Sequence, residues 1–118
     1  MRICFDVDGV LADPGDPWRP YHLRDPYPWV SEKLWGLSNQ GHIIILQTAR
    51  YMGKRDGNQS LAHAEGYVEL IDWCYKHNIP HDEIYLGKAS ADLYVDDRGC
   101  RVESKKGMVD WEKINAYL

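Results

Sequence analysis

Polar side chains that can do chemistry follow four short apolar runs of the sequence. They are Asp6 and Asp8 with Gly9, then Thr48 with Ala49 and Arg50, then Lys88, and finally Asp96 and Asp97. Two carboxylates that leave a strand two residues apart can supply a nucleophile and an acid/base partner for attack on phosphorus. Four carboxylates in one place would repel one another, and a divalent cation with oxygen ligands, most often Mg²⁺, relieves that repulsion. The pattern therefore indicates metal-assisted phosphoryl chemistry.

These polar residues are expected to follow directly after β-strands. Residues 2–7 and 42–48 are short apolar runs that predict buried strands, and 83–86 and 92–95 are two further strand candidates. A strand at 107–109 is a weaker candidate. Residues 10–28 contain five prolines, which excludes a regular helix there and indicates an ordered loop. Gly9 lets the chain turn sharply into this loop.

Helices are predicted between the strands. The spacing of Val30, Leu34 and Leu37 predicts a helix over 29–40, which Gly41 ends. The longest helix has Ser60 as its N-cap, ends at Asn78–Pro80 and carries apolar residues three and four apart: Leu61, Ala64, Val68, Ile71 and Tyr75. A terminal helix over 110–118 is expected to pack through Trp111, Ile114 and Tyr117. Strands alternating with helices predict an open parallel sheet, whose carboxyl edge is where ligands bind.

Composition sets the class of protein. The 118 residues carry 14 Lys and Arg against 18 Asp and Glu, a net charge of −4, which disfavours non-specific binding to nucleic acid. One domain over residues 1–118 is expected. No apolar run is long enough to cross a bilayer and no signal segment is evident, so a cytoplasmic protein is expected. Cys4, Cys74 and Cys100 are interpreted as reduced, mostly buried thiols.

The ordered motifs resemble those of the haloacid dehalogenase superfamily of phosphatases. They are Asp6-Val-Asp8-Gly9-Val10, the apolar strand ending in Thr48, Lys88, and Tyr94-Val-Asp96-Asp97, together spanning residues 4–98. The resemblance implies a three-layer Rossmann-like α/β fold with a mainly parallel sheet flanked by helices. The cap domain usual in that superfamily does not fit here, because neither residues 10–28 nor the single residue between 83–86 and Lys88 can hold one. Loops and a neighbouring subunit are expected to close the site.

The resemblance also implies roles for the individual residues. Asp6 resembles the nucleophile that forms an aspartyl-phosphate, and Asp8 the general acid that protonates the leaving alkoxide and then activates water. Thr48 resembles the hydroxyl that holds a phosphoryl oxygen, and Lys88 the cation that offsets charge. Mg²⁺ would be bound by Asp6, Asp96 and Asp97 and by the backbone carbonyl of Asp8.

Substrate contacts are expected from residues around these motifs. Gly9, Ala49 and Arg50 flank the catalytic positions, although Arg50 could equally pair with Asp97. In the segment 18–24, His22 and Arg24, with Arg19, could touch a second anionic group, or the aromatic residues there could cover the core or a subunit contact. Lys54 and Arg55 are loop cations that could favour an acidic substrate. No histidine pair is interpreted as a metal site, because Pro80 separates His77 from His81.

Three functions remain open from the sequence. The first is a Mg²⁺-dependent phosphatase acting on a small phosphorylated sugar or polyol, since Thr48-Ala-Arg50 and the run from Gly87 to Arg98 resemble phosphatases of bacterial capsular-polysaccharide gene clusters. The second is a polynucleotide 3′-phosphatase, which the acidic balance disfavours. The third is a non-enzymatic phosphoacceptor receiver domain. The partners expected are a small phosphorylated substrate and a second copy of the chain, as a dimer or tetramer, with no membrane and no nucleic acid.

Overall fold

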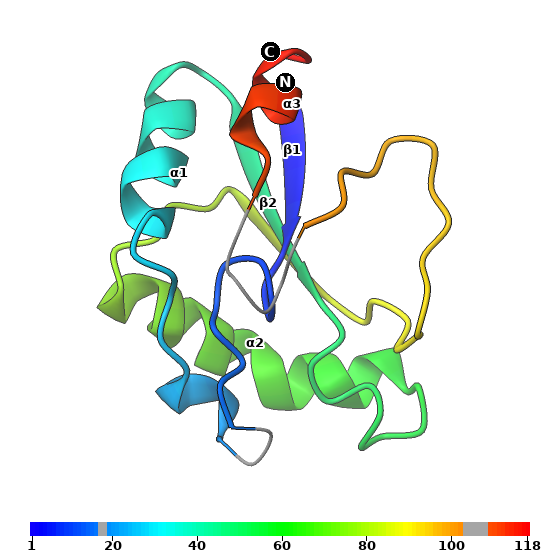
Figure 1. Ribbon diagram of the computed structural model, residues 1–118. Coiled ribbons are helices and arrows are strands. Elements are labelled where there is room, and N and C mark those ends of the chain that lie inside the picture. Colours follow the sequence, from blue (N-terminus) through cyan, green and yellow to red (C-terminus); the bar gives the residue numbers. More distant parts are fainter. Residues whose placement is uncertain (17–18, 103–108) are drawn as a thin grey trace.

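A parallel β-sheet organises the chain. The computed structural model describes residues 1–16, 19–102 and 109–118 (Figure 1). Strands β1 (Arg2–Asp6), β2 (Ile43–Thr48) and β3 (Glu83–Leu86) are parallel and adjacent in the order β1-β2-β3. The expected strands at 2–7, 42–48 and 83–86 are therefore confirmed. Their carboxyl ends lie at one edge of the sheet, next to each other.

The helices bury one apolar side each against this sheet. Helix α1 (Val30–Asn39) packs with β2, and helix α2 (Gln59–Lys76) packs with β3. α1 buries Val30, Leu34 and Leu37, as their spacing predicts. Side chains of both helices meet the sheet in one hydrophobic core that includes Phe5, Ile44, Leu46, Leu70 and Trp73. The core thus fixes both helices against the strands whose ends carry the candidate catalytic groups.

Helix α2 lies where it was predicted, but the face that it buries is not the one that carries its most regular apolar repeat. Asn58, not Ser60, is the N-cap, because the Asn58 side chain accepts a hydrogen bond from the Leu61 amide. The repeat at Leu61, Val68 and Tyr75 is exposed. The buried face consists instead of Ala62, Gly66, Leu70, Trp73 and Cys74. Small residues on that face allow α2 to approach β3 closely: a Cβ atom at position 66 would lie 2.3 Å from Leu86 Cδ2.

The proline-rich segment after β1 is an ordered loop, as predicted. Gly9 has a φ of 87°, in the region that favours glycine, and the chain reverses there. Tyr27 N then donates to Leu11 O at 2.9 Å, and Asp13 N donates to Asp25 O at 2.8 Å. The loop therefore folds back along itself, through the short 3-10 helix η1 (Tyr21–Leu23), and its end returns to the carboxyl edge of the sheet.

The prediction of a strand at 92–95 is wrong in this structure. Residues 88–102 contain no helix or strand, and the side chains of Leu93 and Val95 are exposed. In Figure 1 this segment (yellow to orange) forms a wide loop beside the sheet. The apolar run Leu93-Tyr94-Val95 is only three residues long, too short to hold a strand without a paired neighbour. In the described part of the chain, β1 is consequently an edge strand.

Two further expectations need correction. The terminal helix α3 (Trp111–Asn115) is shorter than 110–118; Trp111 packs against Trp29 and Phe5, but Tyr117 is exposed. Of the three thiols only Cys74 is buried, whereas Cys4 and Cys100 are exposed. The weak strand candidate at 107–109 lies outside the described residues, apart from Val109.

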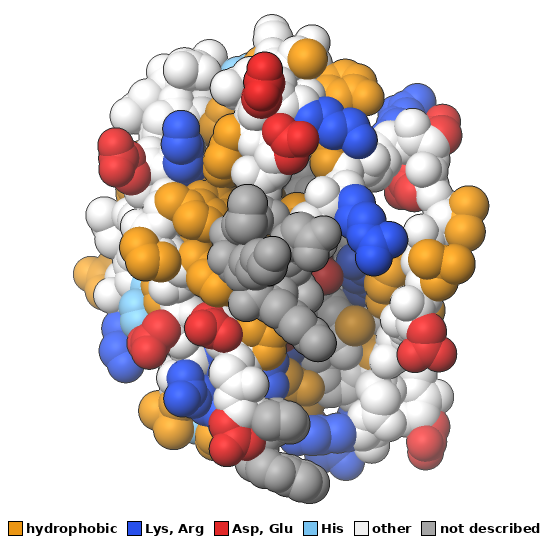
Figure 2. Space-filling model, in the orientation of Figure 1, with side chains coloured by type: hydrophobic (Ala, Val, Ile, Leu, Met, Phe, Trp, Pro, Cys, Tyr) orange, Lys and Arg blue, Asp and Glu red, His pale blue; other side chains and the backbone are white. Residues whose placement is uncertain are grey.

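Acidic, basic and apolar side chains alternate over the face seen in Figure 2, without one sign of charge covering it. None of the helices in the described ranges is both long and apolar enough to cross a membrane.

Candidate active site

Asp6 and Lys88 meet at the carboxyl edge of the sheet. Asp6 is the last residue of β1, and Lys88 follows β3 by two residues. Lys88 Nζ lies 3.4 Å from Asp6 Oδ2, and the two side chains are 21% and 34% exposed. Burial raises the pKa of Asp6 above its usual value, while the Lys88 charge opposes that rise. A carboxylate that is part exposed and faces a cation can approach an anionic phosphoryl group.

Thr48 ties the neighbouring strand ends together. Its side chain is buried, and Thr48 Oγ1 accepts a hydrogen bond from Arg50 N at 3.1 Å. Its carbonyl oxygen accepts from Lys88 N at 3.2 Å. The end of β2 therefore fixes the backbone of Lys88, which places the lysine side chain beside Asp6.

Two arginines hold Asp8. Arg50 Nε donates to Asp8 Oδ2 at 2.8 Å and Arg50 Nη2 donates to Asp8 Oδ1 at 2.9 Å. Arg24 Nη1 lies 3.0 Å from the same Oδ1. The expectation that Arg50 pairs with Asp97 is therefore wrong, because the turn at Gly9 brings Asp8 to Arg50 instead.

Aromatic rings hold these arginines in turn. The guanidinium carbons of Arg24 and Arg50 lie 4.7 and 4.9 Å from the centre of the Tyr21 ring. The Arg50 guanidinium also lies 5.7 Å from the Trp73 ring. Trp73 Nε1 donates to Arg24 O at 2.7 Å, so α2 anchors the loop that carries Arg24. Sequence reasoning missed this arrangement, since a turn residue, a loop residue and a helix residue share no local pattern.

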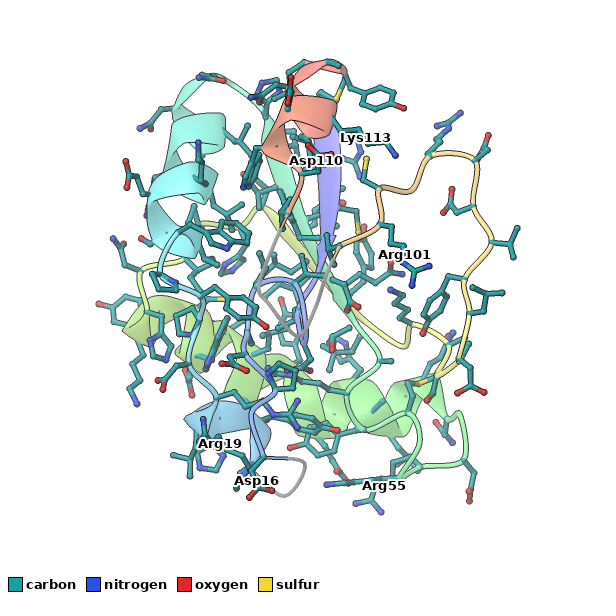
Figure 3. The ribbon with its side chains drawn as sticks, viewed as in Figure 1. Asp16, Arg19, Arg55, Arg101, Asp110 and Lys113 are labelled. Atoms are coloured by element: carbon teal, nitrogen blue, oxygen red, sulfur yellow. The ribbon has the colours of Figure 1, made fainter. Side chains whose placement is uncertain are left out.

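The other expected substrate contacts are divided by the structure. Gly9 makes the turn beside Asp8, and the Ala49 carbonyl accepts from Met52 N at 3.0 Å, at the start of the next loop. Arg24 reaches the site through Asp8. His22 is exposed on η1. Arg19 packs against Gly15, and Figure 3 shows it beside Asp16 at the lower end of the view. Of the segment 18–24, residue 18 lies outside the described part.

The expected magnesium ligands do not come together. Asp96 and Asp97 are exposed on the segment 88–102, where Asp96 Oδ1 accepts a hydrogen bond from Arg98 N at 2.7 Å. Both carboxylate oxygens of Asp8 are bonded to arginine. Among the described residues, no group of three or more His, Cys, Asp or Glu side chains could hold a metal ion. The residues as placed do not fit the predicted magnesium centre, because within the described ranges residues 96–97 do not follow a strand that pairs with β1.

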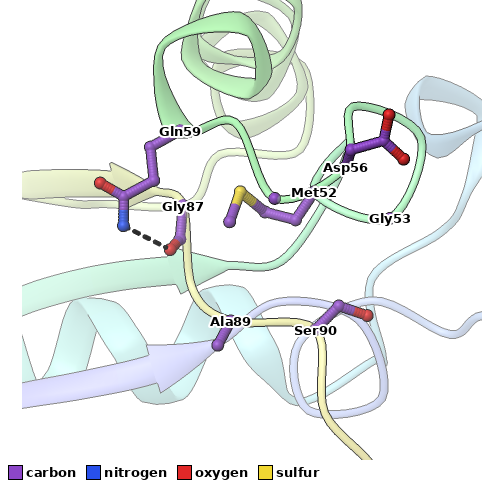
Figure 4. A pocket seen from close by; sticks show the side chains of 8 residues that line it. Met52, Gly53, Asp56, Gln59, Gly87, Ala89 and Ser90 are labelled. Carbon is purple, nitrogen blue, oxygen red and sulfur yellow. Dashed lines mark hydrogen bonds between the residues drawn. The ribbon is translucent and has the colours of Figure 1, made fainter.

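A cavity of about 470 Å³ opens beside Lys88 (Figure 4). Gly87 and Ala89, the neighbours of Lys88, belong to its wall, and Gln59 Nε2 donates to Gly87 O at 3.3 Å across it. The wall mixes polar and apolar groups and includes one acid, Asp56, but no Lys or Arg. It is formed by Met52, Gly53, Asp56, Gly57, Gln59, Gly87, Ala89 and Ser90. Part of the wall is the loop before α2 that contains Gly53 and Gly57. These glycines indicate a loop in the sequence, but they do not indicate where the cavity lies.

Comparison with known proteins defines the fold. No family model matches the chain, and no curated protein matches it. Among solved structures, the chain is similar to a target protein from Vibrio cholerae, with a TM-score of 0.81 and 29% identity over 98% of this chain and 94% of that one. It is also similar to D,D-heptose 1,7-bisphosphate phosphatase from B. bronchiseptica, crystallised with magnesium and phosphate. That likeness has a TM-score of 0.51 and 16% identity, and covers 84% of this chain and 53% of the phosphatase. The expected Rossmann-like α/β fold, with a parallel sheet flanked by helices, is confirmed, and the heptose bisphosphate phosphatase shares it.

Proposed function

We propose that the chain is a phosphatase of the haloacid dehalogenase type, which hydrolyses phosphomonoesters through an aspartyl-phosphate on Asp6. The observation that carries this proposal is the placement of the Asp6 carboxylate, with Lys88 Nζ at 3.4 Å and the Thr48 strand end beside it. A carboxylate nucleophile needs a neighbouring positive charge to meet a phosphate dianion. Lys88 supplies one.

The proposed reaction has two steps. An Asp6 oxygen attacks phosphorus while the bond from phosphorus to the leaving oxygen breaks, and Asp8 gives that oxygen a proton. Asp8 then takes a proton from a water molecule that attacks the aspartyl-phosphate, which releases inorganic phosphate and restores Asp6. Lys88 offsets charge on the phosphoryl oxygens, and the Thr48 hydroxyl is the hydrogen-bond donor assigned to one of them. Asp8 thus enters the first step as the protonated acid and the second as the carboxylate, and Arg24 and Arg50 fix the direction of this carboxyl group.

The proposal includes a magnesium requirement. Its support is the order of Asp6, Asp8, Asp96 and Asp97 along the chain and the magnesium crystallised with the heptose bisphosphate phosphatase. No step above is routed through the ion, because the described residues do not assemble its site. Phosphate release should stop in EDTA and return when Mg²⁺ is added in excess.

The proposed substrate is a small phosphorylated sugar or polyol. The cavity beside Lys88 supports this, since the polar groups of Gln59 and Ser90 in its mixed polar and apolar wall can bond hydroxyl groups. A role in capsule or surface polysaccharide synthesis is supported only by the motifs around Thr48 and Lys88. One domain over residues 1–118, acting in the cytoplasm as a dimer or tetramer, completes the proposal.

Release of inorganic phosphate from a panel of phosphomonoesters tests the proposal. Asp6→Asn should abolish release, whereas Asp72→Asn, an exposed carboxylate on α2, should not change it. Retained activity in Asp6→Asn would contradict the mechanism. A 3′-phosphorylated oligonucleotide belongs in the panel, because a strong preference for it would favour a polynucleotide 3′-phosphatase. An aspartyl-phosphate that lasts for minutes would favour a receiver domain.

A further inference from the structure

We propose that Tyr21, Arg24, Arg50 and Lys54, the Tyr21 cluster, form a subsite for a second anionic group on the substrate. The substrates would then be phosphomonoesters that carry another phosphate or a carboxylate on the leaving group. This inference rests on the proposed function for the reaction at Asp6, but the binding of the second anion can be measured separately.

The three cations of the cluster gather on one ring. Arg24, Arg50 and Lys54 lie 4.7, 4.9 and 5.4 Å from the centre of the Tyr21 ring. Lys54 Nζ also lies 5.5 Å from the Tyr51 ring, and the two tyrosines pack edge to face with centres 5.1 Å apart. Aromatic faces attract cations and offer no negative charge of their own, so they position the three groups without neutralising them.

The positive charge of the cluster exceeds the negative charge beside it. Among the described residues, Asp8 is the carboxylate that pairs with its cations. Three positive charges against one leave a local net of +2, in a chain whose overall charge is −4. Of the two nearby acids on α2, Glu65 is neutralised by Arg55, whereas Glu69 accepts from the neutral Tyr51 hydroxyl and keeps its charge. Counting Glu69 as well, three positive charges against two negative ones leave an excess of +1.

An unpartnered donor points to the same conclusion. Arg50 is 2% exposed, and its Nη1 atom is buried without a hydrogen-bond partner in the described structure. A buried donor on a charged group without an acceptor is costly, more so than for a neutral group. An anion bound at the cluster would offset the excess charge, including that of this unpartnered donor.

Position relative to Asp8 decides which part of the substrate the cluster would meet. Asp8, the proposed proton donor to the leaving oxygen, is bonded directly to Arg24 and Arg50. A group bound at the cluster therefore belongs to the leaving side of the substrate. The cavity beside Lys88 is the less suitable place for an anion, since its wall holds Asp56 and no Lys or Arg.

Binding of two matched ligands tests the subsite. Calorimetry on the Asp6→Asn chain would compare fructose 1,6-bisphosphate with fructose 6-phosphate at one ionic strength. We expect the bisphosphate to bind about tenfold more tightly, the size of one charge-assisted hydrogen bond. Lys54→Gln should bring the ratio of the two dissociation constants close to one. Arg55→Gln is the matched control: it removes the same charge from the next residue, which pairs with Glu65 near the edge of the molecule (Figure 3).

The outcomes separate the two proposals. Equal affinities for both ligands, or an equal loss in Lys54→Gln and Arg55→Gln, would overturn the subsite even if the unmodified chain hydrolyses phosphomonoesters. Absence of phosphate release from every phosphomonoester would contradict the proposed function, while the calorimetric ratio would still decide whether the Tyr21 cluster binds a second anion.

Discussion

Arg50 grips Asp8 with two of its three guanidinium nitrogens, Nε at 2.8 Å and Nη2 at 2.9 Å. Two parallel bonds fix both the position and the plane of the carboxylate, which a single contact would not. Arg50 is buried against Tyr21 and Trp73, so the packing of these rings fixes the guanidinium and, through it, the carboxylate of Asp8. Asp8 thereby depends on residues far from it in the sequence.

Arg50→Lys should damage both activity and stability. An ammonium group cannot make the two-point contact, and it leaves part of a buried ion pair unsatisfied. We expect kcat to fall about 10- to 100-fold and the free energy of unfolding to fall by about 2–4 kcal/mol. Phosphate release and urea unfolding measure these effects. Arg2→Lys is the control, since that arginine pairs with Glu83 in solvent; an equal loss in both variants would contradict the role given to Arg50.

The sequence was sufficient for much of the architecture. The continuous apolar runs predicted β1, β2 and β3, and the spacing of Val30, Leu34 and Leu37 predicted both α1 and its buried face. Topology then brought Asp6, Thr48 and Lys88 to one sheet edge. Such predictions succeed because parallel strands buried by helices have a strong local pattern and a shared carboxyl edge.

Contacts between elements that are distant in the sequence could not be predicted from these local apolar patterns. Helix α2 carries two apolar stripes, and only the fit of Gly66 and Ala62 against the sheet decides which one is buried. The sequence predicted that Arg50 contacts either Asp97 or the substrate, whereas the turn at Gly9 brings Asp8 to it. Residues 92–95 contain three apolar residues in a row, which predicted a strand, but they have no neighbour in the described structure to pair with.

The cysteines should differ sharply in reactivity. Burial raises the pKa of Cys74 to about 12, so almost no thiolate is present at pH 8. Cys4 and Cys100 are exposed, although partial burial also raises the pKa of Cys4, which should make it the slower of the two to react. Alkylation by iodoacetamide should therefore modify Cys4 and Cys100 in the native chain and Cys74 only after denaturation. Mass spectrometry of digested peptides identifies each site. Rapid labelling of Cys74 in the native state would show that α2 does not pack as described.

The two apolar stripes of α2 should respond differently to substitution. Leu70 is fully buried, and Leu70→Ala should lower the free energy of unfolding by about 2–5 kcal/mol. Val68 is 65% exposed, so Val68→Glu should change it by less than about 0.5 kcal/mol. Urea unfolding compares the two variants. A large loss in Val68→Glu that depends on protein concentration would instead place the exposed stripe in the expected contact between copies, which light scattering would detect.

Gly66 and Gly36 provide a matched pair of helical glycines. Gly66→Ala would press its new methyl group against Leu86 and Tyr51, with Cβ 2.3 Å from Leu86 Cδ2 and 3.0 Å from Tyr51 Cδ2. Despite the better helix propensity of alanine, we expect a loss of about 1–3 kcal/mol in the free energy of unfolding. Gly36 has no atom within 4 Å of its Cβ position, so Gly36→Ala should gain about 0.5–1 kcal/mol. Equal gains in both variants would contradict the close packing of α2.

The missing methyl group at position 66 therefore sets a limit on engineering this chain. Leu86 leads into Lys88, and the Tyr51 ring lies against Lys54. A change in the middle of a remote helix would therefore reach two of the four cations that the proposals assign to the substrate. Mutagenesis that replaces every helical glycine with alanine would therefore raise the free energy of unfolding through residue 36 but lower the catalytic activity through residue 66.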